Sequence, residues 1–90
     1  MQSRNKPAPT KAEREHIARL AGLPCILCGT MPVEVHEPEQ GLWFAAIPLC
    51  PVCHRDNKYG LHGQRLNWKA RKWTELHAIN ATIRLLMETA

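Results

Sequence analysis

Apolar residues recur at helical spacing in two parts of the chain. The first stripe consists of Ile17, Leu20 and Ala21. Thr10 and Glu13, just before and inside this segment, have the spacing of a capping box. Gly22 follows and is typical of a helix end. These signals predict a helix over residues 11–21 with its apolar stripe packed on the core.

The second stripe is longer and runs toward the C-terminus. It consists of Leu66, Ala70, Trp73, Leu76, Ile79, Ile83 and Leu86, at intervals of three and four residues. This spacing predicts one long amphipathic helix from Leu66 to near the C-terminus, with Asn67 as its cap. Residues 59–63 precede it and contain two glycines, which favour a loop.

Between the helical stripes the hydrophobic period changes to two. Residues 33–37 alternate apolar and polar side chains, and residues 43–47 form a second strand-like run. Residues 38–41 contain a proline and a glycine and are predicted to form the turn of a β-hairpin. Pro51 suits the first turn of a helix, so a short helix is predicted over residues 50–58.

Four cysteines lie in two CxxC pairs on either side of the predicted hairpin: Cys25 with Cys28, and Cys50 with Cys53. Two pairs at this separation are typical of a tetrahedral zinc site with four thiolate ligands. Gly29 supplies the open φ that the first turn needs. The order of turn, hairpin and short helix predicts an α+β fold, a zinc-stabilised treble clef flanked by an N-terminal helix and the long C-terminal helix. Such a fold leaves function to be argued from its side chains.

The length of 90 residues is near the limit at which a metal commonly helps to stabilise a small core. We predict a flexible basic arm over residues 1–9 and one zinc-binding domain over residues 10–90. No apolar run approaches the roughly 20 residues of a membrane span, and no hydrophobic signal segment follows the first basic residues. The sequence therefore predicts a soluble, cytoplasmic protein with no membrane partner.

The net charge of +4 suits a polyanionic partner such as DNA. Basic residues lie before the first cysteine pair and after the second, whereas the stretch between them carries glutamates and no Lys or Arg. Solvated helix faces would give a similar distribution. If DNA is the partner, the residues expected to contact it are Arg55, Lys58, Arg65, Trp68, Lys69 and Lys72. Trp68 would stack on a base or cover a sugar.

Three of the five histidines fall where a treble clef would bring them together. They are His36 on the first strand, His54 directly after the second cysteine pair, and His62 in the glycine-rich loop. Imidazoles that hold a divalent cation could clamp a phosphate, and a free imidazole could act as a general base. The simpler interpretation is that His54 lies beside a structural zinc and that His62 caps a turn.

The order of these residues resembles the HNH nucleases (His-Me finger, ββα-metal), especially the small zinc-stapled members from phages and prophages. The resemblance covers about residues 23–63. It rests on Cys25-x-x-Cys28-Gly29, on Val33-Glu34-Val35-His36, and on Pro48-Leu49-Cys50-x-x-Cys53-His54 with His62-Gly63 downstream. What it implies is a metal-dependent DNA endonuclease in a bacterial or phage-infected cell.

In this family a strand histidine activates water, and helix histidines bind the catalytic cation. By this resemblance His36 is the general base, and His54 and His62 are ligands of Mg²⁺ or another divalent ion. The cysteines would hold a structural Zn²⁺. The strand of this family usually ends in a pair, a metal-binding residue followed by the histidine base. Here the pair is either Val35-His36, which lacks the ligand, or His36-Glu37, which lacks a histidine base. The first register is preferred, with Glu37 as a substitute ligand.

A second hypothesis is a non-catalytic treble-clef zinc module that binds DNA or a protein partner. A thiol redox protein is disfavoured because the cysteine pairs lack the βαβ context of that motif. A nuclease of this size has little surface to hold a duplex, so a homodimer formed through the C-terminal helix is a further expectation.

Overall fold

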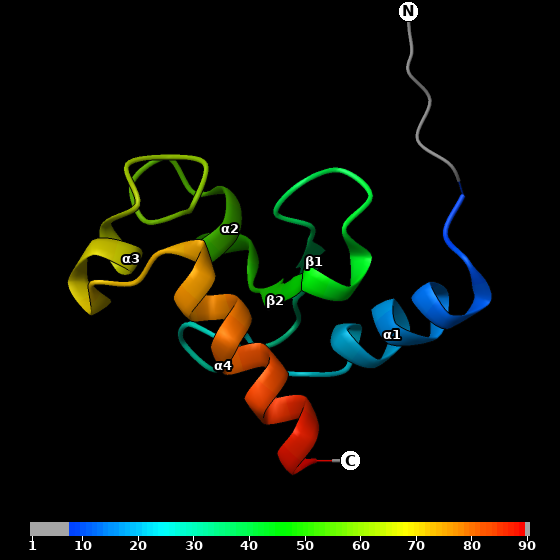
Figure 1. The fold of residues 1–90 in the computed structure, drawn as a ribbon. Coiled ribbons are helices and arrows are strands. Elements are labelled where there is room, and N and C mark those ends of the chain that lie inside the picture. The colour runs from blue at the N-terminus through cyan, green and yellow to red at the C-terminus, as the bar shows by residue number, and fades with distance from the viewer. Residues whose placement is uncertain (1–7, 90) are drawn as a thin grey trace, which may run out of the picture.

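The computed structural model describes residues 8–89, so residues 1–7 of the predicted arm lie outside the described part. The elements in chain order are α1 (Lys11–Ala21), β1 (Glu34–His36), the 3₁₀ turn η1 (Trp43–Ala45), β2 (Ile47–Leu49), α2 (Pro51–Arg55), α3 (Leu66–Arg71) and α4 (Glu75–Glu88) (Figure 1). β1 and β2 form an antiparallel hairpin in which Glu34 pairs with Leu49 and His36 with Ile47. The predicted α+β class is confirmed at this level.

Helix α1 has the predicted bounds and the predicted cap. The backbone N–H of Glu13 donates to Thr10 Oγ1 at 3.1 Å, and the backbone N–H of Thr10 donates to Glu13 Oε1 at 2.7 Å. Leu20 is fully buried where the helix packs beside the hairpin. Arg19 then joins the two ends of the fold, because its guanidinium donates to the carbonyl of Leu86 in α4 at 2.6 Å.

The second half of the hairpin differs from the predicted strand over residues 43–47. The chain forms a 3₁₀ turn first, with Ala45 N–H donating to the Leu42 carbonyl and Ala46 N–H to the Trp43 carbonyl. Strand β2 begins later and is buried at all three positions. Its Pro48 has no N–H to offer a neighbour, but its carbonyl accepts from Ile26 N–H at 2.9 Å. β2 is thus held between β1 and the first cysteine turn.

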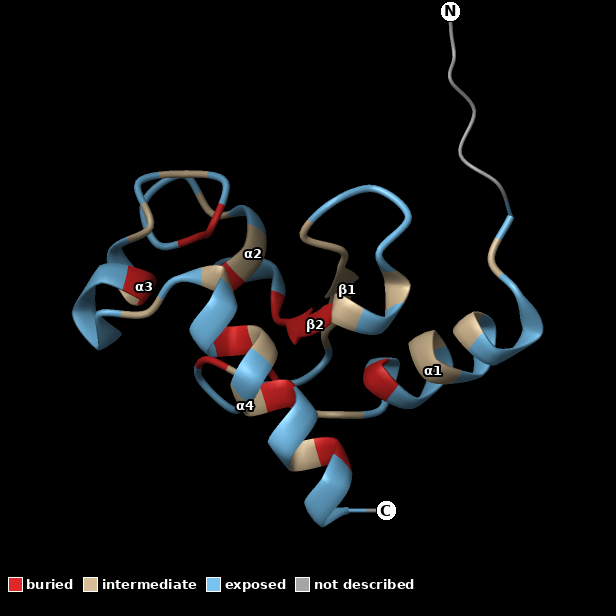
Figure 2. Cartoon of the chain, in the orientation of Figure 1, coloured by how far each residue is buried: buried red, intermediate tan, exposed pale blue. Residues whose placement is uncertain are grey.

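The larger hydrophobic core gathers around β2 and the cysteines (Figure 2). It consists of Cys25, Leu27, Ile47, Leu49, Cys50, Cys53, Leu61, Trp68 and Ala78. Trp68 is 1% exposed, and its indole N–H donates to the carbonyl of Cys53 at 2.9 Å. A smaller cluster of Leu20, Ala46 and Leu86 lies between α1 and the end of α4.

The prediction of one long C-terminal helix capped by Asn67 is wrong. The chain breaks after α3, where Lys72 has a φ of 59°, and restarts at Thr74. Thr74 caps α4 together with His77, whose Nδ1 accepts from the Thr74 backbone N–H at 3.0 Å. The break lets α3 and α4 approach the core from different directions, so that Trp68 and Ala78 are both buried in it. None of the described helices has both the length and the apolar character that crossing a bilayer would need.

Candidate metal centres

The sulfur atoms of the two cysteine pairs form one cluster. The Sγ atoms of Cys25, Cys28, Cys50 and Cys53 all lie within 4.8 Å of one another. The Sγ atoms of Cys28 and Cys50 are 3.6 Å apart. Tetrahedral zinc–thiolate geometry separates neighbouring sulfurs by about 3.8 Å, given a Zn–S bond of about 2.3 Å. The four cysteines are therefore close enough to bind a metal ion such as zinc, as predicted.

Two tight turns place these sulfurs. The first is closed by Gly29 N–H donating to the Cys25 carbonyl at 2.8 Å, with Gly29 at a φ of 83°. The second is the start of α2, where Cys50 is the N-cap residue and its Sγ accepts from Cys53 N–H at 3.4 Å. The side-chain amide of Asn67 donates to Cys53 Sγ at 3.5 Å. Donors aimed at sulfur favour the thiolate form that a metal requires.

The surroundings of the sulfurs have opposing effects on their protonation. Burial raises the pKa of Cys50 and, more strongly, that of Cys53. Burial also acts to raise the pKa of Cys28, but hydrogen bonds with Thr30 and the neighbouring cysteines outweigh it and lower that pKa to about 7. Buried thiols stay protonated unless a cation offsets the charge, so a bound metal is what would make this centre a set of thiolates.

The three histidines that the sequence singled out form a second cluster. Ring nitrogens of His36, His54 and His62 lie within 4.8 Å of one another. Their ring centroids are 5.0 Å apart for His36 and His54, 5.2 Å for His36 and His62, and 4.8 Å for His54 and His62. The first two are partly buried and His62 is exposed, so the cluster is open to solvent on one side.

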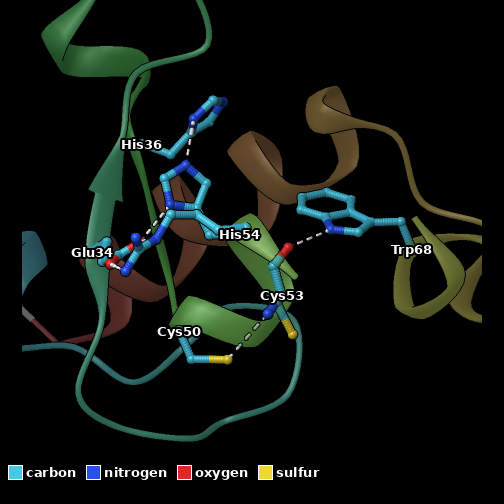
Figure 3. Close-up of polar contacts among 7 residues, drawn as sticks. Glu34, His36, Cys50, Cys53, His54 and Trp68 are labelled. Atoms are coloured by element: carbon cyan, nitrogen blue, oxygen red, sulfur yellow. Dashed lines mark hydrogen bonds and ion pairs between the residues drawn. The ribbon is translucent and has the colours of Figure 1, made fainter. Parts of the chain in front are cut away.

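Each histidine is aimed by its own element. Cys53 and His54 are consecutive on α2 and so diverge by about 100° around the helix axis. The Cys53 sulfur consequently points away from the His54 ring (Figure 3). His62 is held against the same helix end, because its backbone N–H donates to the His54 carbonyl at 3.1 Å. The two clusters thus lie on different sides of α2.

Two glutamates that were not predicted to belong to the site support the histidine rings. His54 Nδ1 lies 2.7 Å from Glu34 Oε1 (Figure 3). His36 Nε2 lies 2.8 Å from Glu75 Oε2. Glu34 also accepts from Arg55 Nε at 2.9 Å. The hydrogen bond from His54, followed by that from Arg55, lowers the pKa of Glu34, so this carboxylate is ionised at neutral pH.

The sequence held a signal for only one of these glutamates. Glu34 is two residues from His36 on a predicted strand, and such residues share a face. Glu75 lies 39 residues from His36, on a helix whose start was predicted wrongly. Glu37, the predicted substitute ligand, accepts from the Gly41 backbone N–H at 2.9 Å across the hairpin loop.

The residues predicted to contact nucleic acid differ in how exposed they are and in whether they are paired with a carboxylate. Lys58, Lys69 and Lys72 are exposed and Arg65 is partly buried. The Arg55 guanidinium pairs with Glu34. Trp68 is buried in the core, so its ring has no free face on which a base could stack, and the prediction of a nucleic-acid contact there is wrong.

The chain matches no protein-family model, no curated protein and no solved structure. The function must therefore be inferred from the two clusters of side chains.

Proposed function

We propose that this protein is a metal-dependent DNA endonuclease that hydrolyses phosphodiester bonds on a zinc-stabilised, HNH-like treble clef. The observation that carries the proposal is the convergence of three imidazoles beside a separate four-cysteine cluster. A structural Zn²⁺ on the cysteines accounts for one cluster. That zinc would not explain the histidine cluster, which faces solvent.

The histidine cluster has the properties that phosphodiester hydrolysis requires. A divalent cation supplies charge neutralisation at the phosphate and lowers the pKa of water. His36, His54 and His62 offer nitrogen atoms within 4.8 Å of one another to bind such a cation. Glu34 and Glu75 hold two of the rings in fixed orientations. The exposed side of the cluster, at His62, is where a DNA backbone would approach.

Plasmid nicking tests this function. Purified protein should convert supercoiled DNA to the open-circular form with Mg²⁺, Mn²⁺ or Zn²⁺, tried separately. His54→Ala should lower the rate roughly 100-fold or more, which is the range that active-site acid–base and metal groups contribute. His16→Ala is the matched control, since His16 lies on α1 with its ring against Phe44. Equal nicking by wild type and His54→Ala would remove the assignment.

DNA binding should depend on the exposed lysines near the histidine cluster. Lys58 lies in the loop that carries His62 and is exposed. Each phosphate that a lysine neutralises adds about 0.9 to the steepness of log affinity against log salt concentration. Lys58→Ala should therefore reduce that slope by about one, measured by fluorescence anisotropy with a labelled duplex. Lys11 lies on α1 and pairs with Glu15, so Lys11→Ala should leave the slope unchanged. An unchanged slope in Lys58→Ala would show that Lys58 does not contact a DNA phosphate.

A non-catalytic zinc module that binds DNA or a protein is the second candidate. Two observations favour it. Val35 occupies the strand position where HNH nucleases usually have a metal-binding residue. The carboxylate of Glu37, the substitute ligand, accepts a hydrogen bond from the Gly41 backbone N–H. This candidate requires salt-sensitive DNA binding, or protein binding, without strand cleavage. Nicking at stoichiometric protein that depends on His54 would exclude it.

A further inference from the structure

We propose that a groove beside α4 binds an unpaired base of single-stranded DNA, stacked on the indole ring of Trp73. The groove has a volume of about 410 Å³ and lies between α4, Trp73 and Ile26 of the first cysteine turn. None of its lining residues belongs to the cysteine or histidine cluster. The inference rests on the proposed function for DNA as the partner, and its test measures binding and not cleavage.

The apolar side of the groove holds one large aromatic ring in a fixed position. Ile26 and Trp73 are partly buried and pack against the larger core. The Arg71 guanidinium carbon lies 4.9 Å from the centroid of the Trp73 ring. The His77 ring is nearly parallel to the indole, at 15°, with centroids 6.4 Å apart, and rings at that distance overlap little. The indole that lines the groove is therefore held in place without being covered by His77, which suits it to stack on a base.

The polar side of the groove offers hydrogen-bonding groups that the protein leaves unused. Within residues 8–89, Trp73 Nε1, His77 Nε2 and the side-chain amide of Asn80 have no hydrogen-bond partner. His77 Nδ1 accepts from the Thr74 backbone N–H at 3.0 Å, so a neutral ring carries its hydrogen on Nε2. The groove thus has donors from two rings and both a donor and an acceptor from Asn80. The edge of a base carries the same mixture of donors and acceptors.

The charges along the groove suit the phosphates of a bound strand. Arg84 lines the groove, and its pair with Glu88 joins side chains that are 78% and 58% exposed. A pair this exposed contributes little, so the guanidinium is free to exchange the carboxylate for a phosphate. Arg71 and Lys72 are exposed just before Trp73. Cations therefore lie at both ends of the row formed by Trp73 and the polar groups of α4.

These features fit an unpaired base better than a duplex. In a duplex both faces of each base are covered by its neighbours and the pairing edge is occupied, so neither an indole nor an amide could reach them in a closed groove. A single strand presents both. The volume of about 410 Å³ lies in the range of cavities that hold small planar ligands. The stacking role that the sequence predicted for Trp68, which is buried, is thereby assigned to Trp73.

The groove and the histidine cluster lie around the same turn of α4. Glu75 is the first residue of the helix and is bonded to His36. His77 comes two residues later, about 160° away around the helix axis. A helix with its side chains is about 10–12 Å across, which a strand spans in roughly three nucleotides. A strand anchored at Trp73 would therefore present a phosphodiester to the histidine cluster a few nucleotides away.

The first test follows the three indole N–H signals by two-dimensional N–H correlation NMR, in protein loaded with one equivalent of Zn²⁺ and no other metal. Replacing each tryptophan in turn by phenylalanine assigns the signals. A single-stranded octamer of deoxyadenosine should shift the Trp73 signal. The Trp68 signal is the internal control and should stay in place, because its N–H is bonded to the Cys53 carbonyl in the core. A Trp73 signal that does not move at millimolar octamer would overturn the inference.

An abasic octamer separates stacking from charge, because it has the same phosphates and no bases. Measured by fluorescence anisotropy, Trp73→Ala should weaken binding of the deoxyadenosine octamer about 5- to 150-fold, the loss of one stacked base. It should leave binding of the abasic octamer unchanged. Met87→Ala is the matched control, since Met87 is exposed on the same helix and lies outside the groove. Equal losses for both octamers, or no loss for either, would contradict a base-binding role for Trp73.

A second variant avoids the core, because Trp73 also packs against it. Asn80 is exposed, so Asn80→Ala should keep the melting temperature of the wild type. It should weaken binding of the deoxyadenosine octamer about 2- to 10-fold, the effect of one lost hydrogen bond, and again spare the abasic octamer. Unchanged binding of both octamers in this variant would contradict the role of Asn80 in the groove.

This proposal and the proposed nuclease fail separately. Base-dependent binding at Trp73 without plasmid nicking would contradict the nuclease and keep the groove as a single-strand site. Nicking that depends on His54, with no response of Trp73 to the octamer, would contradict the groove and keep the nuclease.

Discussion

Removing a metal ion bound by the cysteine cluster should unfold this protein. Three of the four cysteines, Cys25, Cys50 and Cys53, belong to the larger core, so a metal bound by them would hold together the centre of the fold. Structural zinc sites contribute about 10–16 kcal/mol of apparent binding free energy at neutral pH. A domain of this size has a total stability of about 5–15 kcal/mol. A strong chelator under reducing conditions should therefore abolish the cooperative thermal transition followed by circular dichroism.

Re-adding Zn²⁺ should restore that transition, and Cys53→Ser should reproduce the effect of the chelator. His54→Ala is the matched control, because it removes an imidazole from the other cluster and leaves all four sulfurs in place. It should keep a cooperative transition, and chelation should still abolish that transition. A chelated protein that melts as sharply as the metal-loaded one would show that the cysteines are core residues with no structural metal.

The local parts of this fold were predictable because their signals are local. The capping box of α1 and the cysteine spacing lie within a few residues of what they determine. The convergence of the histidines was predictable too, because His54 adjoins a cysteine and His36 lies in the hairpin that joins the two pairs. These placements need only the order of turn, hairpin and helix.

The break between α3 and α4 could not be predicted from periodicity. Apolar residues continue at intervals of three and four through it, and the restart is marked by Thr74 with His77 in place of the usual Glu or Gln of a capping box. The consequences are not local. The break accompanies the burial of Trp68, which explains why the predicted nucleic-acid contact failed. It also makes Glu75 the first residue of α4, within reach of His36, so missing the break meant missing that supporting carboxylate.

The loop that carries His62 should tolerate no side chain at Gly63. A Cβ atom there would lie 2.3 Å from the carbonyl oxygen of Asn57 and 2.4 Å from that of Asp56. Both are backbone atoms, and the loop around them is closed by Gln64 N–H donating to the Asn57 carbonyl at 2.8 Å. Gly63→Ala must therefore displace the loop. We expect a loss of about 2–4 kcal/mol in the free energy of unfolding, the range of severe overpacking.

Gly41→Ala separates this steric effect from the general cost of replacing glycine. Gly41 has a φ of 92°, but a Cβ atom there would meet nothing within 4 Å. Its replacement should cost only the backbone strain, about 1–2 kcal/mol, and leave the histidine cluster intact. Gly63→Ala should in addition lower plasmid nicking, because His62 moves with the loop. Denaturant melts of both variants measure the loss of stability, and nicking assays measure the effect on the histidine cluster. Equal stability losses and equal nicking in the two variants would mean that the loop can move away from Asn57 without displacing His62.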